Sequence, residues 1–376
     1  MKRVCLVTTS PLIVNFFLVP HLMHLSKDYH VALAVTLPGE VPLNPLPGID
    51  VIPVKISRRI QPTSDLAALA SLRRHFRERQ FQLVHSFGPK AGLLASTAGV
   101  AARVGARIHT FTGQIWATRS GPMRALLRTA DRWIERMATH VLADSPSQRD
   151  FLVREGIVRP ERCVVLGDGS LSGVDTERFR PDSAVRVAVR AQLAIGERAR
   201  VVAYLGRLIR DKGVLDLARA FASLPSDTFL LVVGPDEDGL AARMRELAGS
   251  AASRMRFVGY TTQPETFLAA SDVLCLPSYR EGFGTVIIEA AAACVPAVAS
   301  RIYGVTDALV DGETGLLFGP GDAVELARVL GRILVDDALR GRLGAAARRR
   351  AMQHFAQARM TRELAALYAR ILDAAP

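Results

Sequence analysis

The sequence predicts an α/β protein of two domains, each built on a doubly wound sheet of parallel strands. Its 376 residues exceed the length that one hydrophobic core normally organises. Apolar strand-like segments alternate with segments of helical period, and this alternation occurs on both sides of residue 180. Sheets of this kind bind ligands at the carboxyl ends of their strands, so candidate site residues are expected there.

In the first half, apolar segments bounded by polar turns are predicted as strands. These predicted strands are residues 4–8, 31–36, 83–86, 107–111 and 141–144. A helix is predicted over residues 121–138, and another begins near Ser64. The segment 11–17, which follows the first strand, is unusually apolar for a connecting loop; a buried first helix is the alternative.

The second half repeats the alternation and ends in a long helix. Its predicted strands are residues 201–205, 229–233, 256–259 and 273–276. Helices are predicted over residues 213–221 and 285–293. The last predicted helix, residues 355–372, carries an apolar face made of Leu364, Leu367, Tyr368 and Ile371.

Two carboxylates, Glu281 and Glu289, lie in a glycine-rich and apolar segment after the strand 273–276. Residues 282–284 form the turn into the next helix, so Glu281 is expected at the carboxyl end of a strand. Free N–H groups at a helix start suit phosphate, and carboxylates accept hydrogen bonds from sugar hydroxyls. Both acids can also be ordinary surface charges, but an unpaired acid in the apolar run around Glu289 would be costly.

Two cations follow the first predicted strand of the second half. Arg207 comes directly after that strand, and Lys212 lies five residues later at the start of a helix. A guanidinium and an ammonium at this spacing can stabilise the negative charge that grows on a leaving diphosphate. The alternative is a surface pair beside Asp211.

The Glu-x7-Glu segment resembles the signature of retaining GT-B glycosyltransferases of family 4, the glycosyl transferases group 1. Residues 206–213, 311–318 and 172–179 resemble three further motifs of this family, in family order. The likeness extends to bacterial capsule and O-antigen enzymes that act on lipid-linked saccharides. It implies a GT-B fold, in which two Rossmann-like domains face a cleft and the last helix crosses back to the first domain.

The resemblance also implies domain boundaries and residue roles. The acceptor-side domain would comprise residues 1–178 and 355–376, and the nucleotide-sugar donor domain residues 179–354. Arg207, Lys212 and Glu281 would be catalytic, with Glu281 on the hydroxyls of the transferred sugar. The donor-binding set implied in this way is Gly206, Arg207, Lys212, Val258, Gly259, Tyr260, Glu281, Gly282, Phe283, Gly284, Thr285 and Glu289, the last on the ribose.

On the acceptor side, the sequence departs from the family pattern. Many members carry a histidine after the fourth strand of the first domain, where this chain has Thr112. His109 lies nearby, although an isolated histidine in a strand is more often a hydrogen-bonded core residue. Lys90 opens a predicted helix and could meet an acceptor phosphate. Acceptor-side residues are therefore expected among Lys90, His109 and Thr112.

No cofactor and no catalytic metal are expected, because the nucleotide sugar is a substrate. The run Asp236, Glu237 and Asp238 superficially copies a metal motif, but its position after a strand favours turn acids and helix N-terminal charge. Cys5, Cys163, Cys275 and Cys294 are widely spaced in apolar surroundings, which favours reduced core thiols.

The positive charge is concentrated in the first half. Residues 1–180 hold 24 Lys or Arg and 14 Asp or Glu, whereas residues 181–354 hold 21 and 20. Arginines recur every four residues in the predicted helix 121–138, and a second cluster ends the helix that begins near Ser64. These arginines are Arg124, Arg128, Arg132 and Arg136, then Arg73, Arg74, Arg77 and Arg79. Such stripes suit an anionic membrane surface; a solvated helix face and the composition of a high-GC genome are the alternatives.

The sequence therefore predicts a retaining, metal-independent glycosyltransferase. It would move a sugar from a nucleotide donor, a UDP-sugar, to a polyprenyl-diphosphate-linked saccharide in surface polysaccharide biosynthesis. The absence of a signal-peptide pattern or an apolar run of membrane-spanning length predicts a cytoplasmic protein, peripheral on the inner face of the membrane. Two alternatives stay open: a UDP-sugar epimerase of the same fold, and a basic nucleic-acid-binding protein. The second is weakened because this sequence does not interleave aromatic residues with its basic ones.

Overall fold

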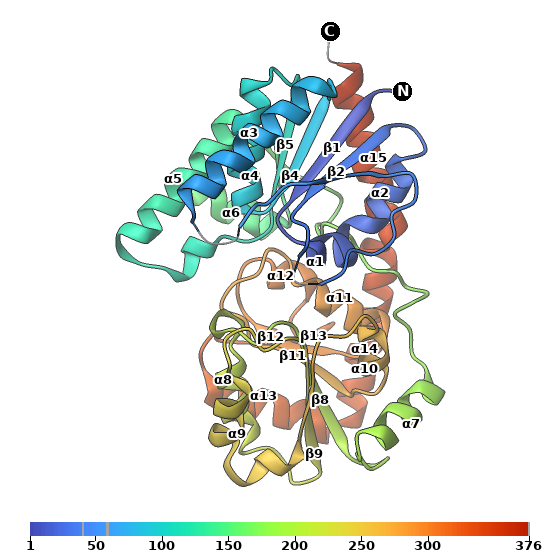
Figure 1. Cartoon of the computed structure of the whole chain (residues 1–376). Helices are drawn as coiled ribbons and strands as arrows, with labels where there is room; N and C mark the ends of the chain where they lie inside the picture. Colours follow the sequence, from blue (N-terminus) through green and yellow to red (C-terminus); the bar gives the residue numbers. More distant parts are fainter. Residues whose placement is uncertain (40, 58–59, 375–376) are drawn as a thin grey trace. The chain divides into compact units, whose positions relative to one another are not determined.

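The computed structural model describes residues 1–39, 41–57 and 60–374, and it divides into two compact units. Unit 1 comprises Met1–Ser172 and Gln357–Pro376, and unit 2 comprises Gly173–Ala356. Each unit has its own sheet of parallel strands with helices on both faces (Figure 1). The predicted α/β class with two doubly wound sheets is confirmed.

The sheet of unit 1 has seven strands in the order β3-β2-β1-β4-β5-β6-β7. Their bounds are β1 Arg3–Thr8, β2 His30–Val35, β3 Asp50–Pro53, β4 Leu83–Phe87, β5 Ala106–Phe111, β6 His140–Ala143 and β7 Cys163–Val165. The five strands that the sequence predicts in this half are all present, whereas β3 and β7 were not predicted. Strand order reverses between β1 and β4, which is where ligands bind in sheets of this topology.

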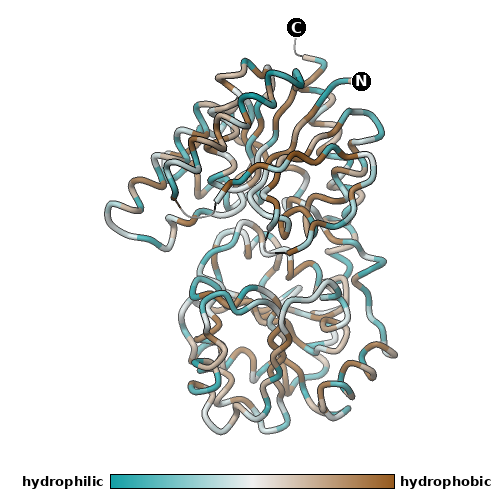
Figure 2. The backbone as a smooth tube through the Cα atoms, in the orientation of Figure 1, coloured by the Kyte–Doolittle hydropathy of each residue, from teal (hydrophilic) through white to brown (hydrophobic). Residues whose placement is uncertain are grey.

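Helices cover the two faces of this sheet with different partners. Their bounds are α1 Pro11–Ile13, α2 Val19–Leu25, α3 Pro62–Glu78, α4 Pro89–Ala101, α5 Gly121–Met137, α6 Pro146–Arg154 and α15 Gln357–Asp373. Helices α2 and α15 close one core, and α3 and α4 close another on the opposite face. Figure 2 shows the apolar residues concentrated in the strands, as these buried cores require.

The apolar segment after β1 is helical rather than a loop. Ser10 accepts a hydrogen bond from the backbone N–H of Leu12 and caps α1, which continues into a π-helical turn, Val14–Leu18. Val14 and Leu18 are fully buried in the core under α2. The unusual hydrophobicity of this segment is therefore explained by packing, which is the alternative that the sequence left open.

Two arginines of the α5 stripe, Arg124 and Arg128, are held against the protein. Arg124 and Arg128 pair with Glu155 at 3.0 and 3.1 Å, and both lie over the ring of Trp116. Arg132 donates to the carbonyl of Gly156 at 3.0 Å. Arg124 and Arg128 are therefore only half-exposed, whereas Arg132 and Arg136 are exposed, and the expected membrane face stays a prediction.

Trp116 forms the centre of this region. Its ring is buried and stacks on Phe151, with ring centroids 5.3 Å apart, and its indole N–H donates to Asp131 at 2.7 Å. Burial raises the pKa of Asp131 to about 7 although this hydrogen bond opposes the shift. The helix α5 is therefore fixed to unit 1 through an aromatic and polar cluster.

The sheet of unit 2 has six strands in the order β10-β9-β8-β11-β12-β13. Their bounds are β8 Arg200–Leu205, β9 Thr228–Val233, β10 Met255–Val258, β11 Val273–Leu276, β12 Ala297–Ser300 and β13 Gly315–Phe318. The four predicted strands are present, and β12 and β13 were not predicted. Strand order reverses between β8 and β11, so the loops after these two strands form the expected binding edge.

The helices of unit 2 also pack on both faces of its sheet. Their bounds are α7 Ser183–Gln192, α8 Val214–Phe221, α9 Ala241–Ala248, α10 Pro264–Ala269, α11 Thr285–Ala292, α12 Val305–Ala308, α13 Ala323–Val335 and α14 Asp337–His354. Residues of α8, α9 and α13 share one core, and residues of α11 and α14 share the other. Short 3-10 turns complete the unit, among them η4, Arg210–Lys212.

The last helix, α15, belongs to unit 1, as the GT-B resemblance implies. Its apolar residues Leu364, Leu367, Tyr368 and Ile371 are buried in the core that α2 covers. The Tyr368 hydroxyl is 2.8 Å from the ring nitrogen Nδ1 of His85 in β4, and Lys2 donates to the carbonyl of Leu372 at 2.6 Å. Within the described part of the chain, no helix combines the length and hydrophobicity needed to cross a membrane.

Candidate functional site

The predicted cations and the first predicted carboxylate of unit 2 lie at the point where strand order reverses. Arg207 and Lys212 follow β8, and Glu281 follows the neighbouring strand β11. Because both strands are parallel, their carboxyl ends meet at one edge of the sheet. The topology alone therefore brings residues about 70 positions apart in sequence to one site.

Lys212 and Glu281 are in direct contact. The Lys212 ammonium donates to Glu281 Oε1 at 2.5 Å, and the hydroxyl of Ser278 donates to the same oxygen at 2.7 Å. The side chains of Lys212 and Glu281 are 21% and 13% exposed. Because both side chains are partly exposed, a ligand can reach this ion pair and replace its internal contacts.

Arg207 is held at the end of β8 by Tyr204 and Glu237. The buried Tyr204 hydroxyl donates to the Arg207 carbonyl at 2.7 Å, and the guanidinium is 3.0 Å from Glu237 Oε2. Burial, with a smaller effect of the Glu281 charge, raises the pKa of Tyr204 well above its usual range. Tyr204 therefore stays a neutral donor between the two loops.

The turn that begins α8 requires a glycine. Gly213 has a φ of +67°, and a Cβ on it would lie 1.9 Å from the carbonyl oxygen of Pro277. This close approach joins the loop after β8 to the loop after β11. Two side-chain contacts support the junction: Asp211 pairs with Arg280 at 2.8 Å, and Tyr279 donates to Asp216.

The amino end of α11 has the geometry that the glycine-rich turn predicts. Gly284 precedes the helix with a φ of +85°, a conformation that side chains disfavour. Phe283 is buried, and its ring packs edge-on against Phe355 with centroids 5.1 Å apart. The Phe283 side chain therefore anchors the turn, in which Gly282 and Gly284 follow Glu281 before the helix begins at Thr285.

Glu289 lies further along α11 and has no hydrogen-bond or ion-pair partner among the described residues. Burial raises the pKa of its carboxyl group to about 7, opposed by the charge of Arg178, which itself pairs with Glu265 at 2.8 Å. An unpartnered carboxyl group of this kind costs free energy in the ligand-free protein. It is the expected state of a residue whose partner is a ligand.

Val258, Gly259 and Tyr260, the region expected near the base, end the edge strand β10 and enter its loop. Val258 is half-buried, Gly259 is exposed, and Tyr260 is 37% exposed. The backbone N–H of Gly234 donates to the carbonyls of Val258 and Gly259 at 2.9 and 3.2 Å. This segment is thus attached to the loop after β9, which also carries Glu237.

The three acids after β9 have separate structural roles. Asp236 accepts hydrogen bonds from the N–H groups of Leu240 and Ala241 at the start of α9, and Asp238 accepts one from the N–H of Arg210. Glu237 pairs with Arg207. The interpretation of this run as turn acids and helix N-terminal charge is confirmed for Asp236.

The residues expected on the acceptor side belong to unit 1. Lys90, in the first turn of α4, pairs with Asp65 of α3 at 2.6 Å. Thr112 is half-buried just after β5. Both residues lie at the carboxyl side of their strands, where ligands bind in this topology, and their predicted role stays a prediction.

His109 is fully buried in β5. Its Nδ1 is 2.9 Å from the hydroxyl of Ser86, and a Cβ on Gly92 would lie 2.4 Å from its ring, so α4 covers it directly. Burial lowers the pKa of His109 to about 3. These contacts favour a neutral core histidine over contact with an acceptor.

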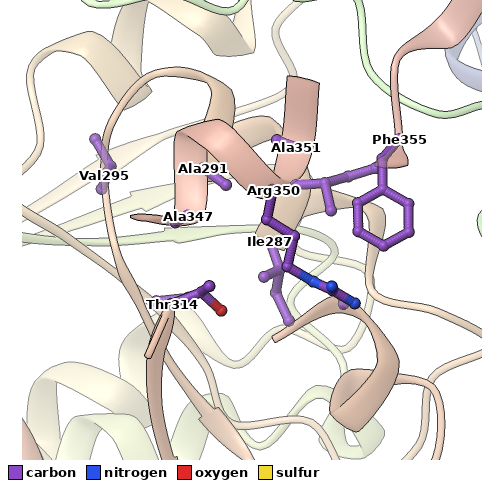
Figure 3. A pocket seen from close by; sticks show the side chains of 11 residues that line it. Ile287, Ala291, Val295, Thr314, Ala347, Arg350, Ala351 and Phe355 are labelled. Carbon is purple, nitrogen blue, oxygen red and sulfur yellow. The ribbon is translucent and has the colours of Figure 1, made fainter. Parts of the chain in front are cut away.

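A small cavity of about 10 Å³ lies inside unit 2, with room for about one water molecule. Figure 3 shows its lining of aliphatic side chains together with Arg350, whose guanidinium lies over the Phe355 ring. Among the residues described around it, none belongs to the predicted donor site. We interpret it as a packing void between α11 and α14.

Sequence reasoning missed three residues that shape the site. Ser278 supports Glu281, Tyr204 supports Arg207, and Glu237 pairs with Arg207. A serine three positions before the acid, and a tyrosine three positions before the arginine, were the available signals. The partner of Glu237 could not be found from sequence, because the two residues come from different strands.

Comparisons with known proteins agree with this arrangement. Residues 185–350 match the family model described as glycosyl transferases group 1, and residues 21–169 match the glycosyl transferase 4-like domain. The chain belongs to the group 1 glycosyltransferases. The similar protein CapM of Staphylococcus aureus, a capsular polysaccharide biosynthesis glycosyltransferase, is 29% identical over 322 residues, which cover 85% of this chain and 84% of CapM.

Solved structures show the fold of this group 1 glycosyltransferase. Sucrose-phosphate synthase from Thermosynechococcus elongatus has a TM-score of 0.83 at 23% identity and covers 100% of both chains. Anabaena HepE, solved with UDP and glucose, has a TM-score of 0.81 at 20% identity, covering 98% of this chain and 100% of its own. The fold is GT-B, and the family match and CapM favour neither the epimerase nor the nucleic-acid-binding alternative.

Proposed function

We propose that this glycosyltransferase transfers a sugar, with retained anomeric configuration and without a catalytic metal, from a UDP-sugar to a lipid-linked saccharide. The observation that carries the donor proposal is the meeting of Arg207, Lys212 and Glu281 where strand order reverses in unit 2. Two cations there suit a diphosphate, and a carboxylate suits sugar hydroxyls. The solved complexes of HepE with UDP and with UDP-glucose support a uridine nucleotide.

The chemistry asked of these side chains is electrostatic. Negative charge grows on the leaving diphosphate as the bond to the anomeric carbon lengthens, and fixed cations stabilise that charge in the transition state. In this proposal Arg207 and Lys212 hold the diphosphate, Glu281 the transferred sugar and Glu289 the ribose. The backbone of Gly282, Phe283, Gly284 and Thr285 faces the phosphates, Gly206 lets them approach the chain, and Val258, Gly259 and Tyr260 lie beside the base.

The donor proposal is tested by thermal shift with UDP-, GDP- and ADP-sugars, because a ligand that binds the folded protein raises its melting temperature. We expect UDP-sugars to give the largest shift. Equal shifts with all three bases would contradict a uridine preference. Proton NMR of the glycoside product then tests retention, which fails if the anomeric configuration inverts relative to the donor.

The acceptor proposal is a polyprenyl-diphosphate-linked saccharide handled by unit 1 at the inner face of the cytoplasmic membrane. CapM, whose name places it in capsular polysaccharide biosynthesis, supports this acceptor class. The surface features that support a membrane are on α5, where Met123, Leu126 and Trp133 are 45%, 54% and 46% exposed. Exposed Arg119, just before α5, and exposed Arg136, in its last turn, provide positive charge.

Binding to vesicles of phosphatidylglycerol tests this surface. We expect Leu126→Ser to weaken binding by about tenfold, because a buried leucine side chain contributes roughly 1.5 kcal/mol or more. Val187→Ser, which removes an apolar side chain of similar exposure, 55%, from α7 in unit 2, is the matched control. Equal vesicle binding by wild type and Leu126→Ser would contradict the proposed surface.

A further inference from the structure

We propose that Glu237 is an internal competitor for the donor phosphate. Its carboxylate neutralises Arg207 while no nucleotide is bound, and an incoming nucleoside diphosphate must displace it. Glu237 would then weaken nucleotide binding and assist release of the nucleoside diphosphate product. This inference rests on the proposed donor site and names a residue that sets its affinity.

The geometry allows the Glu237 carboxylate to take the place of a phosphate oxygen. Its Oε2 lies 3.0 Å from Nη1 of Arg207, and the two side chains are 31% and 37% exposed. Carboxylate and phosphate oxygens present the same acceptors to a guanidinium, so the two compete for one donor group. Because the pair is accessible, a ligand can reach Arg207 without local unfolding.

The loop that carries Glu237 is fixed without its carboxylate. The N–H of Leu208 donates to the Pro235 carbonyl at 2.9 Å, and the N–H of Asp238 donates to the Leu208 carbonyl at 3.3 Å. Asp238 in turn accepts from the N–H of Arg210 at 3.1 Å. Removing the charge of Glu237 should therefore leave the backbone of both loops in place.

The second ion pair at this edge differs in kind. Glu281 is bound to Lys212 and also accepts a hydrogen bond from Ser278, and its proposed partner in the complex is the sugar. Glu281 thus has a place in the bound state, whereas no contact with substrate is proposed for Glu237. This difference predicts opposite effects: loss of Glu281 weakens donor binding, and loss of the Glu237 charge strengthens it.

The test is calorimetric titration of UDP into the full-length wild type and Glu237→Gln. We expect UDP to bind Glu237→Gln about threefold more tightly, as the energy of an accessible ion pair suggests. Inhibition by product UDP should strengthen by the same factor. Glu246→Gln, which removes one charge from an exposed pair with Arg243 in α9, should bind UDP like the wild type.

The Arg207→Ala background makes the test specific. If Glu237 acts by occupying Arg207, Glu237→Gln has no effect on UDP binding once Arg207 is absent. The inference would be overturned if Glu237→Gln alone bound UDP no more tightly than the wild type. It would also be overturned if adding Glu237→Gln to Arg207→Ala raised the UDP affinity as much as it does in the wild type. Failure of the wild type to bind any nucleoside diphosphate would instead refute the proposed function from which the inference follows.

Discussion

Arg207 and Lys212 are both paired with carboxylates of their own chain, at 3.0 and 2.5 Å. The cost of moving two cations into a protein site is thereby offset before any ligand arrives. Ligand binding is then an exchange of partners rather than the creation of new charge contacts. Before that exchange, the internal ion pairs keep Arg207 and Lys212 oriented.

Replacing either cation by alanine should slow the reaction much more than it changes the fold. We expect kcat of Arg207→Ala or Lys212→Ala to fall by about a hundredfold, the usual effect of removing one group that stabilises developing negative charge. Steady-state kinetics with a UDP-sugar measures this. Arg243→Ala, which removes an exposed arginine of α9, is the control and should keep its kcat. If Arg207→Ala or Lys212→Ala also kept most of its kcat, the role assigned to that cation would be contradicted.

Glu289 should make the stability of the ligand-free protein depend on pH. Its folded pKa of about 7 lies above the ordinary value, so its ionised form destabilises the fold as pH rises from about 4.5 through 7. Glu289→Gln should therefore raise the free energy of unfolding at pH 8, by up to about 3 kcal/mol, and little at pH 4.5. Urea denaturation followed by circular dichroism measures the difference.

The control for this prediction is Glu313→Gln, which changes an exposed acid in the same unit. It should alter the free energy of unfolding little at either pH. An equal gain for Glu289→Gln at pH 8 and pH 4.5 would mean that ionisation is not the cause. Glu289→Gln should also bind UDP less tightly than the wild type, because an amide is a weaker hydrogen-bond acceptor than a carboxylate.

At the scale of elements, the start of α8 depends on Gly213. Gly213→Ala should destabilise the protein by more than about 2 kcal/mol and weaken UDP binding, because its Cβ would collide with the Pro277 carbonyl. Gly239→Ala is a matched control, since Gly239 has the same φ of +67° but no atom within 4 Å of a Cβ. If both variants lost the same free energy of unfolding in urea denaturation, the strained φ alone, and not the contact with Pro277, would explain the loss.

The sequence predicted nine of the thirteen strands of the described chain and missed four short ones. The strands β3, β7, β12 and β13, of three or four residues each, were missed, although β6, β10 and β11, also of four residues, were predicted. The apolar segment after β1 was expected to be irregular, but the cap at Ser10 and the burial of Val14 make it helical. Alternation therefore revealed the α/β class, while β3, β7, β12 and β13 required the tertiary structure.

Side-chain pairing was the other limit of the sequence. The donor site followed from the position of residues at strand ends, since parallel topology brings those ends together. The partners of the α5 arginines did not follow, because Glu155 and Gly156 come from the turn after a different helix. Four-residue spacing shows which residues share a helix face and does not show what covers that face.

At the scale of the whole molecule, the two units should respond differently to acid. His21, His85 and His109 are buried in unit 1, and burial lowers the pKa values of all three, to about 4 for His21 and about 3 for His109. The unfolded chain binds protons at these histidines below pH 6.5, whereas the folded chain does not. Unit 1 therefore loses stability as pH falls, by about 2 kcal/mol between pH 7 and 5 for each of His21 and His109, and protonation of Asp131, whose pKa is raised to about 7, offsets part of this loss.

Hydrogen–deuterium exchange with mass spectrometry, corrected for intrinsic exchange rates, checks this difference. We expect peptides of unit 1 to lose protection between pH 7 and pH 5 while peptides of unit 2 keep theirs. Protonation of Glu289 favours unit 2 over the same range, so the two effects act in opposite directions. Earlier loss of protection in unit 2 would contradict the prediction.

Trp116 and Trp133 both belong to unit 1, and the chain holds 2 tryptophans in all. Tryptophan fluorescence therefore reports on unit 1. Unit 2, which holds the proposed donor site, contributes no tryptophan emission. A change in tryptophan emission during a UDP titration would therefore record a response of unit 1 to occupancy of unit 2. Intrinsic fluorescence of the natural chain is in this way an assay for communication between the halves, with no label required.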